Sequence, residues 1–159
     1  MPSPVALDRL KKLLEYDPDT GIFRWLRAHQ KVQVGDIAGT LDDKGYIRIK
    51  VDGRKYRAHR LAWLYMTGHW PIDQIDHRDM VKTNNAFKNL READNTQTNG
   101  NRRRQRNNTS GYRGVSWWKI GRRWRAAIGK QFIGYFDTRQ EAARAYAVAA
   151  QRYFGEFAR

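Results

Sequence analysis

The last third of the chain is a series of short β-rich runs divided by tight turns, and it ends in one long amphipathic stretch. The runs "GYRGVSWWK", "RRWRAAI" and "QFIGYF" are separated by turns at Gly121 and Gly129–Lys130, a spacing typical of antiparallel strands. In the stretch that follows, Thr138 and Glu141 fit a capping box, and small and aromatic residues recur at helical spacing. These patterns predict a three-stranded antiparallel sheet packed on one α-helix.

The charge of the chain restricts what it can bind. Its 159 residues include 31 Lys and Arg against 16 Asp and Glu, a formal charge of +15. From Asn95 to Phe136 ten residues are basic and none is acidic. Such an excess indicates an anionic partner, either nucleic acid or an acidic membrane surface. Because the basic residues do not lie on an amphipathic helix with a large apolar face, we expect nucleic acid and no membrane.

Composition excludes several other classes of protein. The sequence contains no cysteine, so disulfides and thiolate metal sites are excluded. No apolar run approaches the ~18 residues that span a bilayer, and charged residues interrupt the apolar ones near the N-terminus, unlike a secretory signal. We therefore expect a soluble, cytoplasmic protein.

The β-rich runs also predict where an anionic partner would bind. In "RRWRAAI", Arg123 and Arg125 share one face of a strand, while the apolar residues between them share the other. Arginine forks and aromatic rings are the side chains that grip phosphates and bases. A sheet that packs on the helix by its apolar side would present the arginines to a DNA groove. The candidate DNA contacts are Arg102, Arg103, Arg104, Arg113, Trp118, Arg123 and Arg125.

The earlier part of the chain is predicted to mix helices with hairpins. Residues 5–16 have leucines at helical spacing, and residues 35–57 alternate apolar and polar residues around two turns. Helical spacing returns from His59 to Met66, and Gly68 follows as a candidate C-cap. The boundaries we expect are an N-terminal helix and hairpin region at 1–70, a polar central block at 71–101, a basic linker at 102–110, and the sheet and helix module at 111–159.

The central block contains "IDHRDMVKTNNAFKNL" at residues 75–90, whose residue types suit phosphodiester cleavage. That reaction needs a base to activate water and positive charge to stabilise the phosphate and the leaving oxygen. Histidine suits the first task at neutral pH, and a carboxylate holding Mg²⁺ suits the second. Asp76 and His77 would point to opposite faces of a strand, which allows both tasks. A polar loop without a catalytic role is the alternative that spacing alone leaves open.

Two resemblances bear on this choice. "DH" followed by "NN" and "NL" resembles the HNH endonucleases, specifically the homing-type branch of phages and introns, and "YDPDTGIFRWL" and "AHRLAW" are similar to the lead-in of that branch. "SGYRGVSWWK", "WRAAI" and "GYFDTRQEAARAYAVAA" resemble the Apetala-two/ERF DNA-binding domain, which some HNH homing endonucleases carry at the C-terminus. The resemblances imply an α+β fold: a small ββα-metal nuclease domain with its core at 71–101, followed by a three-stranded antiparallel sheet packed on one α-helix.

The HNH resemblance implies a role for each matching residue. His77 would be the general base, Asp76 a ligand of a single Mg²⁺ or Mn²⁺, and Asn89 the central residue whose amide braces the loop that carries His77. The second ligand of the family, His or Asn, is expected about nine residues after the central Asn, where this chain has Thr98, with Asn99 next to it. Asn99 is our candidate ligand after a local change of register; a weak Thr98 ligand and an impaired site are the alternatives.

The remaining polar residues of this region are interpreted as structural. Asn84 and Asn85 are typical turn formers, and His59 is interpreted as a histidine that packs a helix.

The sequence therefore predicts a metal-dependent DNA endonuclease that nicks or cuts double-stranded DNA, in the bacterial host cell of a phage or mobile element. No protein partner is implied. The alternatives are a non-catalytic DNA-binding protein derived from an HNH nuclease, which Thr98 favours, and an RNA-binding accessory protein.

Overall fold

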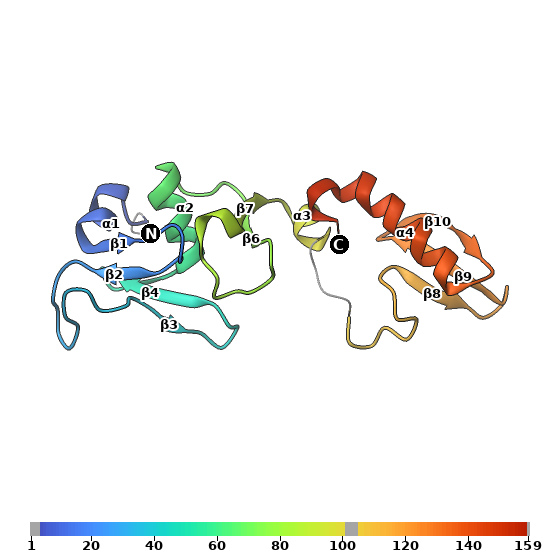
Figure 1. Ribbon diagram of the computed structural model, residues 1–159, viewed down its shortest axis with the longest axis horizontal. Coiled ribbons are helices and arrows are strands. Elements are labelled where there is room, and N and C mark those ends of the chain that lie inside the picture. The colour runs from blue at the N-terminus through green and yellow to red at the C-terminus, as the bar shows by residue number, and fades with distance from the viewer. Residues whose placement is uncertain (1–3, 101–104, 159) are drawn as a thin grey trace. The chain divides into compact units, whose positions relative to one another are not determined.

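The computed structural model describes residues 4–100 and 105–158, and the side chain of Asn99 is not described. The chain divides into two compact units, Met1–Ala93 and Asp94–Arg159 (Figure 1). The division falls inside the range 71–101 that the sequence suggests for the nuclease core. Arg102, Arg103 and Arg104, which are candidate DNA contacts, lie outside the described residues.

The described residues of the first unit, 4–93, form two helices and three small antiparallel sheets. The sheets pair β1 with β2, join β3, β4 and β5 in that order, and pair β6 with β7. The elements of this unit, in chain order, are α1 (Leu7–Leu13), β1 (Leu14–Tyr16), β2 (Phe23–Trp25), β3 (Thr40–Leu41), β4 (Ile47–Val51), β5 (Arg54–Arg57), α2 (Ala58–Thr67), β6 (Gln74–His77), the 3₁₀ turn η1 (Phe87–Asn89) and β7 (Leu90–Ala93).

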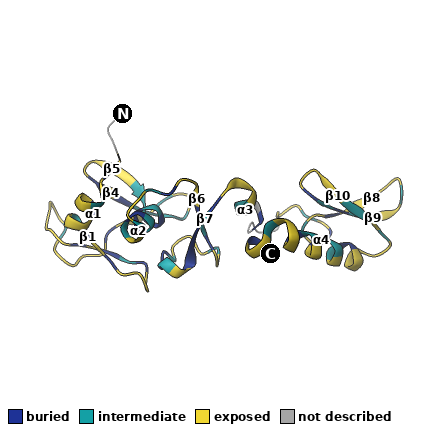
Figure 2. Cartoon of the chain, turned by 90° about the horizontal axis from the view of Figure 1, so that it is seen from above, coloured by how far each residue is buried: buried dark blue, intermediate teal, exposed yellow. Residues whose placement is uncertain are grey.

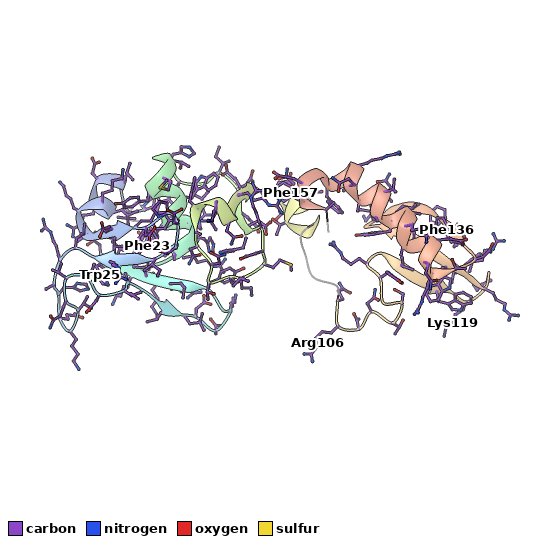
Figure 3. All side chains as sticks on the ribbon, in the orientation of Figure 1. Phe23, Trp25, Arg106, Lys119, Phe136 and Phe157 are labelled. Carbon is purple, nitrogen blue, oxygen red and sulfur yellow. The ribbon has the colours of Figure 1, made fainter. Side chains whose placement is uncertain are left out.

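One hydrophobic core holds this unit together. Leu10 of α1, Phe23 of β2, Ile49 of β4 and Leu61 of α2 are each at most 2% exposed and belong to a single cluster. Buried and exposed residues alternate along β1 and β2; Figure 2 colours the chain by burial, and Phe23 is labelled in Figure 3. Full burial of each such side chain contributes roughly 1.5–3 kcal/mol, so the core fixes α2 against the sheets.

The first helix is shorter than the leucine spacing predicts. It ends at Leu13, and Leu14 and Tyr16 are buried in β1, where they pair with Trp25 and Phe23 of β2. The turn between the strands is stabilised by Asp17, whose carboxylate accepts hydrogen bonds from the backbone N–H groups of Asp19 and Thr20. Strand pairing across this turn therefore overrides the local helical pattern.

The helix that the spacing predicts from His59 to Met66 is present as α2. Its C-cap is Gly68 in the left-handed conformation, with φ 84°, and the Gly68 N–H donates to the Leu64 carbonyl at 3.0 Å. The C-cap prediction is confirmed. The helix buries Leu61, Ala62 and Leu64 on one face and carries His59 near its start.

The second unit contains a three-stranded antiparallel sheet in the order β10-β9-β8, against which α4 packs. Its elements are α3 (Asn95–Gly100), β8 (Val115–Trp118), β9 (Arg123–Ile128), β10 (Gln131–Phe136), α4 (Arg139–Phe154) and the 3₁₀ turn η2 (Gly155–Phe157). Thr138 and Glu141 form the expected capping box at the start of α4. The mixed helix and sheet content agrees with the predicted α+β class. Within the described residues, no helix is long and apolar enough to cross a membrane.

A close approach between the sheet and α4 requires a glycine before β8. Gly114 has φ 64°, and a Cβ atom at this position would lie 2.1 Å from the ring of Tyr146. Tyr146 is buried with Val115 and Ala126 in the core of this unit. Only a residue without a side chain fits there, because both the backbone conformation and the space exclude a Cβ atom.

Candidate active site

The β6–β7 hairpin places Asp76 and His77 on opposite faces of one strand. Asp76 lies opposite Arg91 and His77 opposite Leu90 in the antiparallel register. His77 is 5% exposed and faces α2 and the loop before β4, whereas the Asp76 side chain is paired with Arg91. The alternation of side chains along a strand thus separates the two groups, although they are neighbours in sequence.

His77 is held by contacts from three other segments. Its Nε2 lies 3.2 Å from Oδ1 of Asn85. Its ring meets that of His59 edge to face with centroids 5.0 Å apart, and the ring of Tyr46 is 6.1 Å away. Burial lowers the pKa of His77, although its contact with Asn85 partly offsets this effect. The imidazole is therefore neutral near pH 7 and is able to accept a proton.

The loop after His77 is tied to the start of β7 by Asn89. The Asn89 side chain accepts a hydrogen bond from the Asp79 N–H at 3.1 Å and donates to Asp79 Oδ1 at 2.9 Å and to the Asn84 carbonyl at 2.8 Å. The backbone carbonyl of Asn89 also accepts from the Arg78 N–H at 2.9 Å. One buried amide therefore fixes both ends of the loop.

Asp79 is the centre of this loop. Its carboxylate accepts hydrogen bonds from the Val81 N–H and from the amides of Asn84 and Asn89. Burial by itself would raise the pKa of Asp79, but these hydrogen bonds outweigh burial and hold the pKa below its usual range. Asp79 therefore remains ionised at neutral pH as part of the loop structure.

The N-terminal hairpin packs against the segment that holds His77. The Tyr16 hydroxyl donates to the Asn85 carbonyl at 2.7 Å, and the Phe87 N–H donates to the Pro18 carbonyl at 2.8 Å. A Cβ atom on Gly21 would lie 2.2 Å from the Ala86 nitrogen. The turn at 17–21 therefore rests directly on residues 85–87 and fixes the position of Asn85.

Asp76 forms a largely buried ion pair with Arg91. Nε and Nη2 of Arg91 lie 3.1 and 3.0 Å from Asp76 Oδ2. The side chain of Asp76 is 12% exposed and that of Arg91 is 7% exposed. The guanidinium compensates the buried carboxylate from the neighbouring strand. The sequence analysis did not predict that Arg91 pairs with Asp76. The register of the β6–β7 hairpin would have identified Arg91, because oppositely charged residues that face each other across two strands attract.

The donor set of the described residues fits part of a magnesium shell. A carboxylate is the ligand that Mg²⁺ prefers, and the ion commonly completes its shell with waters and substrate phosphates. Asp76 provides such a carboxylate, whereas nowhere in the described ranges do three His, Asp or Glu side chains gather as a metal cluster. Thr98 Oγ1 is buried and has no hydrogen-bond partner among the described residues. Thr98 and Asn99 belong to the second unit.

The second unit places three of the four described candidate DNA contacts on one face of its sheet. Register pairs Trp118 with Arg123 and Ser116 with Arg125, so these side chains share the face opposite the buried Val115 and Ala126. The remaining candidate in the described region, Arg113, donates to the Gly100 carbonyl at 2.7 Å, a contact between the loop before β8 and the end of α3.

Two aromatic residues extend the outer face beyond the sequence-based candidates. Tyr135 stacks on Trp118 with ring centroids 4.4 Å apart, and Phe132 lies 4.9 Å from Tyr135 and beneath the guanidinium of Arg125. The register shifts between Phe132 and Gly134, and this irregularity allows both rings to lie on the outer face. Simple alternation in "QFIGYF" does not place them together.

Comparison with known proteins bears on the first unit and α3. Residues 56–100 match the family model described as HNH endonuclease. This segment is similar to the HNH endonucleases. The matched range begins in β5 and includes α2, the β6–β7 hairpin and α3, so His77, Asp76 and Asn89 lie within the HNH segment.

One solved structure is also similar to the chain. It is described as DNA binding and cleavage by the HNH homing endonuclease I-HmuI, with 22% identity and a TM-score of 0.44. The match covers 57% of this chain and 51% of that chain, so the similarity spans about half the length of the relative. No match was found among curated proteins.

Proposed function

We propose that the chain is a metal-dependent DNA endonuclease of the HNH type, which hydrolyses phosphodiester bonds in one or both strands of double-stranded DNA. The observation that carries the proposal is the arrangement of His77, a buried and neutral imidazole held by Asn85, on the strand that presents Asp76 from its other face. Both residues lie in the segment that matches the HNH endonucleases.

Each residue has a distinct task in this proposal. His77 takes a proton from the attacking water, and the hydrogen bond to Asn85 keeps the ring in place while it does so. Asn89 keeps the loop after His77 fixed. Asp76, with Asn99 as the second candidate ligand, would hold a single Mg²⁺ or Mn²⁺, which supplies positive charge for the phosphate and the leaving oxygen when bound.

The second unit supplies DNA binding in this proposal. The outer face of its sheet joins Arg123 and Arg125 to the stacked rings of Trp118 and Tyr135, a combination suited to phosphates and bases. Arg102, Arg103 and Arg104 would add phosphate contacts. In this proposal the second unit is a DNA-binding domain of the Apetala-two/ERF type, and the chain comes from a homing-type element of a phage or other mobile DNA.

Cleavage of supercoiled plasmid tests the proposal. We expect nicking or linearisation that requires Mg²⁺ or Mn²⁺ and that falls at least ~100-fold in His77→Ala, since a general base contributes at least that factor. His69→Ala is the matched control, because His69 is exposed and its ring nitrogen lies 3.3 Å from the Trp70 carbonyl. Metal-dependent nicking that survives His77→Ala undiminished would exclude the mechanism.

A second candidate function is a non-catalytic DNA-binding protein derived from such a nuclease. The ion pair with Arg91 favours it, because the guanidinium already neutralises the carboxylate that would hold a metal ion. Thr98 at the position of the second ligand favours it as well. Tight DNA binding with no cleavage in any divalent metal would support this candidate over the nuclease.

A further inference from the structure

The β4–β5 hairpin places like charges directly opposite each other. Its register pairs Arg48 with Arg57 and Lys50 with Lys55, and all four side chains lie on the face opposite the buried Ile49. Cross-strand pairs of like charge destabilise a sheet. A folded hairpin that keeps two such pairs on one face is therefore better suited to an anionic ligand than to water alone.

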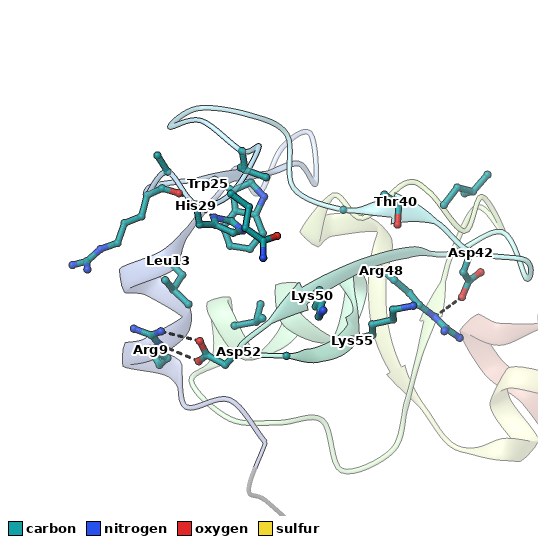
Figure 4. A pocket seen from close by; sticks show the side chains of 18 of the residues that line it. Arg9, Leu13, Trp25, His29, Thr40, Asp42, Arg48, Lys50, Asp52 and Lys55 are labelled. Carbon is teal, nitrogen blue, oxygen red and sulfur yellow. Dashed lines mark hydrogen bonds and ion pairs between the residues drawn. The ribbon is translucent and has the colours of Figure 1, made fainter.

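Nearby carboxylates neutralise only part of this face. Asp42 pairs with Arg48 at 2.8 Å, and Asp52 pairs with Arg9 at 2.8 Å (Figure 4). Across residues 4–100 and 105–158, no carboxylate forms an ion pair with Lys50 or Lys55.

The two lysines line a broad groove of about 930 Å³. Its basic residues are Arg9, Arg27, Arg48, Lys50 and Lys55, and its acidic residues are Asp42, Asp43 and Asp52. Arg9 and Arg48 are paired with carboxylates, whereas Lys50 and Lys55 are available to bind phosphate groups that enter this groove.

The basic face continues from the hairpin to the candidate active site. The guanidinium of Arg57 lies 4.4 Å from the centre of the Tyr46 ring, and Lys82 Nζ lies 4.8 Å from the same ring. Lys82 also donates to the Lys44 carbonyl at 2.7 Å, which connects the loop after β6 to the loop before β4. Tyr46 in turn lies beside His77. Two cations therefore lie over the Tyr46 ring, whose centre is 6.1 Å from that of the His77 ring.

We propose that the outer face of β4 and β5, continued by Arg57 and Lys82 around Tyr46, binds the phosphate backbone of double-stranded DNA and leads the strand to His77. The inference rests on the proposed nuclease function. It assigns to the first unit a DNA-binding surface separate from the sheet of the second unit. Phosphates on this surface relieve the repulsion between the paired cations. The basic row leads toward His77, the residue that acts on DNA in the proposed function, and this favours DNA as the ligand.

The salt dependence of DNA binding tests this surface. The affinity of the full chain for a short duplex is measured over a series of salt concentrations in EDTA, so that no cleavage is required. Each lost phosphate contact reduces the slope of log Kd against log[salt] by about 0.9, so Lys50→Gln with Lys55→Gln should reduce it by about 2. The control is Lys11→Gln with Lys12→Gln on α1, where both lysines are exposed and the slope should change by less than about 0.5.

Stability measurements keep this test independent of folding. The Lys50→Gln, Lys55→Gln protein should unfold at the same Tm as the wild type or a higher one, since the substitution removes a like-charge pair. A folded variant with an unchanged slope would overturn the inference, and so would an equal fall in the α1 control. If the wild type fails to cleave with any metal while the difference in slope persists, the nuclease proposal fails and the binding surface stands.

Lys82 tests the extension toward His77. Lys82→Gln should reduce the slope by about 1, whereas Lys88→Gln, an exposed lysine of the same segment, should leave it unchanged. Equal slopes in these two variants would show that the DNA path does not reach Tyr46.

Discussion

The rings of His59 and His77 meet edge to face with their centroids 5.0 Å apart, although one residue lies in α2 and the other in β6. Both imidazoles are buried, and burial together with the neighbouring His77 lowers the pKa of His59 to about 3. A proton on His59 would place a positive charge beside the candidate general base. The pair therefore links the stability of the fold to the protonation of the site.

The stability of the protein should decrease in mild acid because of His59. The folded pKa lies below the unfolded value of about 6.5, so the unfolded state binds the extra proton first. The stabilisation is fully present above pH 6.5 and is lost as the pH falls toward 3. Between pH 7 and pH 4, the free energy of unfolding of the wild type should fall by about 3 kcal/mol more than that of His59→Gln. Urea denaturation over this pH range measures both, and parallel curves would contradict the assignment.

Removing the Asn85 side chain should impair the reaction more than binding. In Asn85→Ala the imidazole of His77 loses its contact with the Asn85 amide, so kcat should fall by roughly 10- to 100-fold, a part of the general-base contribution. The duplex Kd measured in EDTA should stay within about 2-fold, since the phosphate contacts that determine it are retained. Asn84→Ala is the matched control, because the Asn84 side chain hydrogen-bonds to Asp79 and to the Ala86 N–H rather than to His77. Equal rates in the two variants would show that Asn85 does not orient the base.

Arg91→Ala should destabilise the first unit strongly. It leaves the Asp76 carboxylate buried without its counter-charge, and breaking such a pair costs about 3–5 kcal/mol. If Asp76 also binds a divalent ion, millimolar Mn²⁺ should restore part of the lost stability in Arg91→Ala but not in the double variant with Asp76→Asn. Thermal unfolding with and without Mn²⁺ measures the effect. Identical responses of the two variants to Mn²⁺ would remove Asp76 from the metal site.

Two glycine substitutions separate steric overlap from backbone strain in the second unit. Gly114→Ala places a Cβ atom 2.1 Å from the Tyr146 ring at a φ of 64°, so it should cost about 2–5 kcal/mol from overpacking and left-handed strain together. Gly129→Ala has a similar φ of 55° and no atom within 4 Å of the added Cβ, so it should cost only about 1–2 kcal/mol. Chemical denaturation compares the two, and equal losses would mean that the contact with Tyr146 relaxes.

The features that the sequence predicted correctly are those with local signals. The αL cap at Gly68 and the capping box of Thr138 and Glu141 depend on residues within one helical turn of each other. The opposite directions of Asp76 and His77 follow from the alternation of a strand. Such features are readable because neighbouring residues alone determine them.

The contacts that the sequence did not predict join residues far apart in the chain. His59 meets His77 only because α2 packs against the β6–β7 hairpin, and Arg91 meets Asp76 only through the register of that hairpin. Leu14 leaves the helical pattern because β2 offers it a partner. Asn85 looks like an ordinary turn residue, since nothing in its neighbours identifies His77 as its contact.

The turn at 17–21 determines how much of the chain must fold to support the candidate active site. Tyr16 and Pro18 make hydrogen bonds to residues 85 and 87, so a fragment that starts at residue 56 would lose the segment that supports Asn85. The matched HNH segment at 56–100 is therefore smaller than the unit that must fold together. If recombination exchanges parts of such genes, a junction between β2 and β6 would separate His77 from the turn at 17–21 that supports Asn85. A junction after β7 would keep this support and exchange only the second unit.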